Sequence, residues 1–124
     1  ATVRLPPSLD LIRHMEPNWV EVERPLWSKW DRAFREPVRL GTCPACEAVD
    51  VRTWYLTWDP TPLTVARREF VGRGFVWQWC CGCGRYRFLS CAVPLEASTV
   101  NERYGEPPAK LRALADAYSQ GGRA

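Results

Sequence analysis

Residues 75–91 read FVWQWCCGCGRYRFLSC and hold four of the six cysteines of the chain. An earlier stretch, at residues 43–46, reads CPAC. Cys80 and Cys83 repeat the spacing of that first pair, and 33 residues lie between the two pairs. Two Cys-x-x-Cys pairs next to β-prone runs are typical of a tetrahedral site in which four thiolates bind zinc. We therefore expect one structural Zn²⁺ per chain, bound by Cys43, Cys46, Cys80 and Cys83.

The run CCGCG at residues 80–84 allows two ways of choosing the second pair. Pairing Cys80 with Cys83 matches the first pair, and the glycine directly after Cys83 can adopt a positive φ. Pairing Cys81 with Cys83 would leave one residue between the ligands and would strain the turn. We therefore expect Cys80 and Cys83 to be ligands and Cys81 to be a bystander. Cys91 is expected to be a buried free thiol.

Three other uses of cysteine share part of this pattern. Disulfides suit an even number of cysteines, but they are typical of secreted chains, and no secretory leader pattern is visible. Iron sites and iron–sulfur clusters use the same thiolates, so the ligands alone leave zinc and iron open. A redox Cys-x-x-Cys pair usually opens a helix, whereas both pairs here lead into predicted strands. Structural zinc is the interpretation that we favour.

The CPAC and WCCGCG motifs, set between predicted hairpins, resemble the zinc-ribbon group over about residues 41–91. Known members of that group use the metal as a clamp on the fold, so the resemblance implies a structural site. It does not indicate a function, because ribbons occur in nucleic-acid-binding, protein-binding and enzyme-attached modules. The chain departs from the plain pattern in two ways: no glycine follows Cys46, and Cys81 is extra.

A second pattern resembles small bacterial immunity proteins of polymorphic toxin systems. Some of these carry a Trp-rich strand before a Cys-x-x-Cys pair and a Ser-x-x-x-Pro run after it. The corresponding residues here are WQWC at 77–80, Cys83, Ser90 and Pro94. The resemblance implies a bacterial, cytoplasmic protein that binds a toxin and masks it.

Length and composition predict one globular domain over residues 1–124, because 46% of the residues are hydrophobic and 25% are charged. The fold class that we expect is α+β: a zinc-ribbon-like antiparallel sheet of three to four strands, with flanking N-terminal and C-terminal helices. No run of 18 apolar residues predicts a membrane span, and we expect a cytoplasmic protein. The expected segments are a helical N-terminal part at 1–37, the zinc-ribbon core at 38–95, C-terminal helices at 96–119 and a frayed tail at 120–124.

Four helices are expected from their start and stop signals. The first runs over residues 8–15, and the second starts at Pro25 and runs to about Arg35. A capping box with Thr99 as N-cap and Glu102 at N3 predicts the third, which stops at Gly105. The fourth follows Pro107 and Pro108 and runs to about residue 119. Two apolar stripes are expected to be buried: Leu26, Trp27, Trp30, Ala33 and Phe34 in the second helix, and Leu111, Leu114 and Tyr118 in the fourth.

Strands are expected at residues 51–58, 68–71, 75–80 and 85–92, because β-branched and aromatic residues alternate there. Gly72, Arg73 and Gly74 have the composition of a three-residue hairpin loop. Large side chains fall on both faces of the last two strands. Such a sheet needs cover on both sides, and the helices are expected to supply it.

The function predicted from these features is non-enzymatic, because no phosphate-binding loop or multi-histidine catalytic set is visible and four cysteines leave no open position on zinc. We expect a protein partner, most specifically a toxin domain, and neither a membrane nor a small-molecule substrate. The alternative is nucleic acid, bound by the Arg and aromatic residues of 67–87. Against it, the formal charge of +3 falls to about +1 once four thiolates hold one Zn²⁺. The residues expected to contact the partner are Arg67, Arg68, Arg73, Arg85, Arg87, Trp77 and Tyr86.

Overall fold

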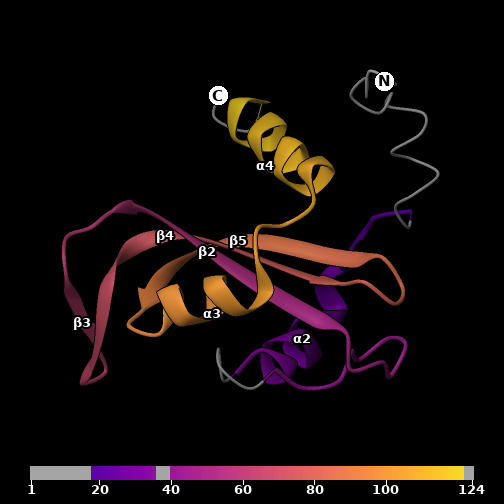
Figure 1. Ribbon diagram of the computed structural model, residues 1–124, viewed down its shortest axis with the longest axis horizontal. Coiled ribbons are helices and arrows are strands. Elements are labelled where there is room, and N and C mark those ends of the chain that lie inside the picture. The colour runs from indigo at the N-terminus through magenta and orange to yellow at the C-terminus, as the bar shows by residue number, and fades with distance from the viewer. Residues whose placement is uncertain (1–17, 36–39, 122–124) are drawn as a thin grey trace, which may run out of the picture.

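A computed structural model describes residues 18–35 and 40–121, with side chains of the last helix described as far as residue 116. The elements in chain order are β1 (Val20–Glu21), η1 (Arg24–Leu26), α2 (Trp27–Ala33), β2 (Val51–Asp59), β3 (Leu63–Val65), β4 (Arg68–Cys80), β5 (Arg85–Pro94), α3 (Ala97–Tyr104) and α4 (Ala109–Gly121). They form an α+β fold around one sheet (Figure 1). The helix expected at residues 8–15 lies outside the described residues.

The sheet has five strands in the order β1-β5-β4-β2, with β3 beside β4. It is mixed, because β1 pairs with β5 in the parallel direction. The Val20 N–H donates to the Gly84 carbonyl and the Val22 N–H to the Tyr86 carbonyl, both at 2.8 Å. The expectation of a purely antiparallel sheet of three to four strands is therefore wrong. A strand of two residues is too short to show the alternation by which the others were predicted.

β4 continues through Gly72, Arg73 and Gly74, with a shift in its pairing with β5 between Phe70 and Gly72, so the hairpin loop expected there is wrong. Glycine is required at both positions because the backbone of β2 lies very close to β4. A Cβ on Gly72 would overlap the Asp59 carbonyl, and a Cβ on Gly74 would overlap the Leu56 carbonyl. The chain instead reverses at Ala66 and Arg67, between the paired residues Val65 and Arg68. Both turn residues have positive φ, 49° and 67°, as a type I′ hairpin turn requires.

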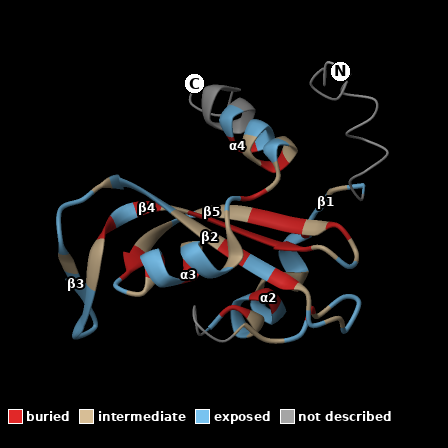
Figure 2. Ribbon diagram, in the orientation of Figure 1, coloured by how far each residue is buried: buried red, intermediate tan, exposed pale blue. Residues whose placement is uncertain are grey.

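Helices cover both faces of the sheet, as expected, and each face has its own buried cluster (Figure 2). We call the first the α2 face; its buried residues are Val22, Trp30, Phe34, Cys43, Val51 and Cys80. The second, the α4 face, holds Trp77, Trp79, Tyr86, Leu111 and Ala115. The stripe predicted for α2 is confirmed, since all five of its residues belong to or pack against the first cluster. In α4, Leu111 is buried as predicted but Leu114 is 37% exposed.

α3 lies along β2 (Figure 1) and begins earlier than expected. Its N-cap is Glu96, which makes no side-chain cap bond, so the capping box predicted at Thr99 is wrong. Gly105 ends the helix with a φ of 76°, as predicted. α4 runs to Gly121, two residues past its predicted end. Among the described residues, no helix is long and apolar enough to span a membrane.

Candidate metal centre

The four cysteines of the two Cys-x-x-Cys pairs come together at one end of the sheet. All four Sγ atoms lie within 4.8 Å of one another. The Sγ atoms of Cys43 and Cys83 are 3.8 Å apart, and those of Cys46 and Cys80 are 3.6 Å apart. A tetrahedral zinc ion with Zn–S bonds of about 2.3 Å requires sulfurs separated by about 3.8 Å. The thiols are thus already placed at the corners of a site that could hold a metal ion, with zinc as the preferred one.

The two pairs have the same backbone geometry. In the first, the Glu47 N–H donates to the Cys43 carbonyl at 2.9 Å, and in the second the Gly84 N–H donates to the Cys80 carbonyl at 3.0 Å. Each donor directly follows the second cysteine of its pair and has a positive φ, 62° at Glu47 and 77° at Gly84. The positive φ expected at Gly84 is confirmed. Glu47 adopts the same conformation although it is not a glycine. The turn of the first cysteine pair therefore forms even though no glycine follows Cys46.

Burial of the thiols opposes their ionisation unless a cation is present. Burial raises the pKa of Cys80 to about 12 and also raises the pKa of Cys43. Burial opposes ionisation of Cys83 too, but hydrogen bonds from Arg85 and from the neighbouring thiols lower its pKa to about 7. A divalent cation would therefore displace protons from the site as it binds, because zinc is held by thiolates.

The site joins segments that are far apart in the chain. The first pair lies in a loop with turns but no helix or strand, whereas the second links β4 to β5. The Gly41 N–H donates to the Ala33 carbonyl at 2.8 Å, which connects that loop to the end of α2. Gly82 lies against the site, since a Cβ there would be 3.5 Å from the Sγ atoms of Cys46 and Cys80. A bound ion would connect the loop of the first pair to the ends of β4 and β5, and through the loop would also stabilise the position of α2.

The remaining two cysteines lie outside this group. Cys81 packs against the cluster of the α4 face, and its N–H donates to the Asp50 carbonyl at 3.1 Å. Cys91 is a half-buried free thiol on β5, and burial raises its pKa to about 11. The choice of Cys80 over Cys81 as the partner of Cys83 thus matches the arrangement of the sulfurs.

Three of the residues expected to contact a partner are buried. Trp77 is 4% exposed, Tyr86 8% and Arg87 2%, so their side chains pack inside the fold and do not face a partner. The first two belong to the α4 face. Alternation alone could not reveal this, because both faces of the sheet are covered.

Arg87 fastens α2 to the sheet. Its guanidinium forms an ion pair with Asp31 at 2.7 Å and donates to the Gln78 side-chain oxygen at 2.6 Å. It also lies over the rings of Trp27 and Trp30, at 5.3 and 5.9 Å from their centroids. The sequence did not predict these contacts of Arg87, because α2 and β5 are far apart in the chain and come together only in the fold.

Three of the arginines expected to contact a partner lie at the opposite end of the sheet. Arg67, Arg68 and Arg73 are exposed on the β3–β4 hairpin, whereas Arg85 is partly buried and hydrogen-bonds to Cys83. Exposed apolar side chains lie in the same region: Trp58 is 57% exposed and Val65 49%. Trp58 was not among the predicted contact residues, because only the fold distinguishes it from the buried tryptophans.

Comparisons with protein-family models, with curated proteins and with solved structures find no match for this chain. Its function must be inferred from these residues.

Proposed function

We propose that the chain is a non-catalytic, protein-binding domain whose fold is held together by a structural zinc ion. The observation that carries the zinc part is the closed set of four sulfurs, with every pair within 4.8 Å. Four cysteine ligands occupy all positions of a tetrahedral ion, whereas a catalytic zinc keeps one position for water or substrate. The site therefore suits a clamp and not a reaction.

The clamp would contribute much of the stability of the fold. Structural zinc sites bind with an apparent free energy of about 10–16 kcal/mol at neutral pH. A domain of this size is stable by only about 5–15 kcal/mol in total. Cys43, in the irregular loop, and Cys80, at the end of β4, are both almost fully buried at the site. Removing the ion would leave this loop with little to hold it against the sheet.

The protein-binding part rests on the hairpin end of the molecule. Trp58 is exposed there together with Arg67, Arg68 and Arg73. Tryptophan and arginine are the residue types most enriched at the energetic centres of protein interfaces. Nucleic acid is the alternative partner, but Asp59 and Glu69 interrupt the basic surface and the sequence pI of about 8.6 is below the range typical of basic nucleic-acid-binding domains.

The most specific form of this proposal is an immunity-type inhibitor that covers the active surface of a bacterial toxin. Its support is the sequence pattern around residues 77–83 with Ser90 and Pro94. The test is genetic: a neighbouring gene should encode a large secreted protein with a variable C-terminal domain, and co-expression of the chain should restore the growth of cells that express that domain. Growth arrest that persists despite soluble expression of both proteins would remove the immunity assignment.

The zinc proposal is tested by native mass spectrometry of the purified chain. We expect one zinc per chain, and we expect a chelator to remove the ion and the folded state together. A folded protein that holds less than about one metal per chain would contradict the structural zinc site. Visible absorption together with bound iron would show that the metal is iron and not zinc.

A gel-shift titration at about 150 mM salt separates the partner classes, since a steep salt dependence of binding would favour nucleic acid.

A further inference from the structure

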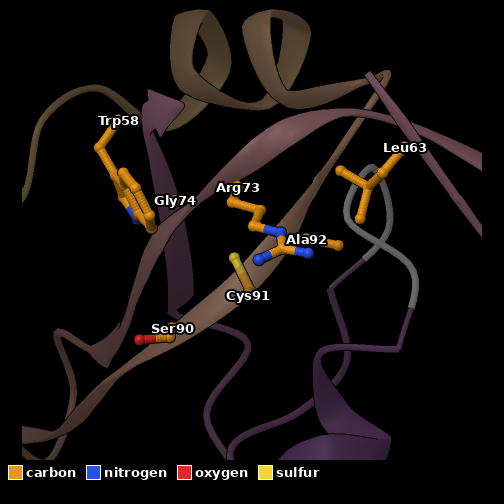
Figure 3. Close-up of a pocket in the computed structure, with 7 residues that line it drawn as sticks. All are labelled: Trp58, Leu63, Arg73, Gly74, Ser90, Cys91 and Ala92. Atoms are coloured by element: carbon orange, nitrogen blue, oxygen red, sulfur yellow. The ribbon is translucent and has the colours of Figure 1, made fainter. Parts of the chain in front are cut away.

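A pocket opens at the hairpin end of the sheet, on the side away from the cysteine cluster. Its volume is about 360 Å³, and it is lined by Trp58, Leu63, Arg73, Gly74, Ser90, Cys91 and Ala92. In Figure 3, Arg73 and Cys91 lie at its centre, with Trp58 on one side and Leu63 on the other. This size is near the lower limit for ligand pockets, so it suits one or two side chains of a partner and not a large cofactor.

Arg73 is the only residue among those lining the pocket that carries a fixed charge. Cys91 adds no competing anion near neutral pH, because burial raises its pKa to about 11. Within residues 18–35 and 40–121, the Arg73 guanidinium forms no direct ion pair, although Asp59 is paired with Arg73 across β2 and β4 and the two charges attract each other. A guanidinium that forms no direct ion pair and lies beside apolar surface can bind a carboxylate of a partner.

Two acidic side chains lie near the pocket and do not cancel this preference. Asp59 Oδ1 accepts hydrogen bonds from the Thr61 N–H at 3.1 Å and from the Thr61 hydroxyl at 2.7 Å. These two bonds, with a smaller attraction to Arg73, lower the pKa of Asp59, so the main partner of this carboxylate is its own turn and not Arg73. Glu69 is exposed on β4, where the neighbouring Arg67 and Arg68 offset its charge. The local balance therefore remains positive.

The apolar surface beside the pocket indicates that the partner also presents an apolar side chain. Trp58 is 57% exposed and Val65 49%, and both stand on the strands that flank the pocket. An indole exposed to this extent buries a large apolar area when a partner covers it. A nucleic acid would need a continuous track of phosphate contacts, which Asp59 and Glu69 interrupt.

We propose that this pocket binds an Asp or Glu side chain of a partner protein, presented next to an aromatic or aliphatic residue that packs on Trp58. The Arg73 guanidinium pairs with the carboxylate, and Leu63 and Ala92 line the apolar wall. This assignment rests on the protein-binding function proposed above and names the chemistry of the partner surface.

The experiment is an NMR titration of the zinc-loaded, ¹⁵N-labelled chain with two synthetic peptides of equal length, Ac-GLEFELG-NH₂ and Ac-GLKFKLG-NH₂. We expect the acidic peptide to shift the indole N–H of Trp58 and the amides of Gly74 and Ala92 in a saturable way, and the lysine peptide to leave them in place. Arg73→Glu and Trp58→Ala should each weaken binding at least tenfold. Lys29→Glu is the matched control, since Lys29 is exposed on α2 at the other end of the sheet and the change in charge is the same.

Several results would overturn the assignment. These are equal shifts with the lysine peptide, no shifts with the acidic one, equal weakening by Lys29→Glu, or stronger shifts of the same signals with the oligonucleotide dT₁₂. Failure of the pocket is distinguishable from failure of the function. A partner that binds Arg73→Glu as tightly as the wild type removes only the pocket, whereas tight binding of dT₁₂ with no protein partner removes the protein-binding function itself.

Discussion

Glu47 takes, in the first cysteine pair, the backbone position that Gly84 takes in the second. Their φ angles are 62° and 77°, and each N–H donates to the carbonyl of the first cysteine of its pair. A glutamate in the left-handed region costs roughly 1 kcal/mol or more relative to glycine, because its Cβ crowds the following carbonyl. The two halves of the site are thus alike in geometry and unequal in strain.

Relief of that strain gives the first prediction. Glu47→Gly should raise the free energy of unfolding of the zinc-loaded protein by up to about 1 kcal/mol, since the Glu47 side chain is exposed and, within residues 18–35 and 40–121, makes no hydrogen bond or ion pair that would be lost. Urea unfolding measures the change. Gly84→Ala is the reciprocal variant, and it should destabilise by about the same amount. A destabilised Glu47→Gly protein would show that the glutamate side chain stabilises the loop.

Ligand identity gives the second prediction. Cys80→Ser should lose the metal and the folded state, because three thiolates would remain around an ion whose fourth ligand is gone. Cys81→Ser is the matched control, one residue away and outside the group of four sulfurs, and it should keep one zinc per chain. Native mass spectrometry and circular dichroism measure metal content and folding. Loss of metal from Cys81→Ser alone would reverse the assignment of the pair.

The ion pair between Arg87 and Asp31 gives the third prediction, because its two ends are unequally exposed. The Arg87 side chain is 2% exposed and the Asp31 side chain 65%. Arg87→Met should cost about 2–4 kcal/mol, since it leaves the buried Gln78 oxygen without its donor. Asp31→Asn should cost less, about 1–2 kcal/mol, because the buried guanidinium loses its counter-ion but an amide oxygen can still accept its hydrogen bond and the Gln78 oxygen remains. Equal costs in urea unfolding would mean that the ion pair, and not the buried hydrogen bond, holds α2 in place.

The free edge of β2 gives the fourth prediction. The Asn101 side chain accepts from the Tyr55 N–H at 2.7 Å and donates to the Tyr55 carbonyl at 2.8 Å, so α3 satisfies both backbone groups of one edge residue. Asn101→Ala should cost about 1–3 kcal/mol and should promote self-association through the uncovered edge. Unfolding and size-exclusion chromatography measure the two effects. The neighbouring Glu102→Ala is the control, because Glu102 is exposed, and an equal loss there would point to the helix and not to the edge.

The four cysteines of the candidate metal site could be predicted from the sequence because the evidence for them is local. Zinc chemistry demands a spacing within each pair, and that spacing is visible at Cys43 and Cys46 without knowledge of the fold. The stripe of α2 could be predicted for the same reason, since a helix places residues three and four apart on one side.

The features that escaped prediction depend on contacts between distant segments. Gly72 and Gly74 look like turn residues, yet their role is the missing Cβ where β2 comes close. Arg87 looks like a surface residue, yet α2 buries it. The parallel strand β1 has only two residues, which are too few to show an alternating pattern in the sequence. Its pairing with β5, which includes the hydrogen bond from the Val20 N–H to the Gly84 carbonyl, is visible only in the folded chain.

The cysteine cluster and the β3–β4 hairpin stand at opposite ends of the long strand β4, which runs from Arg68 to Cys80. Substitutions at the hairpin therefore change residues at the far end of β4 from the four cysteines that could hold a metal ion. We expect such an arrangement to tolerate variation, because the sequence of the hairpin can change while the framework at the other end stays the same. The same separation makes the domain a practical scaffold, on which new hairpin sequences can be introduced and selected.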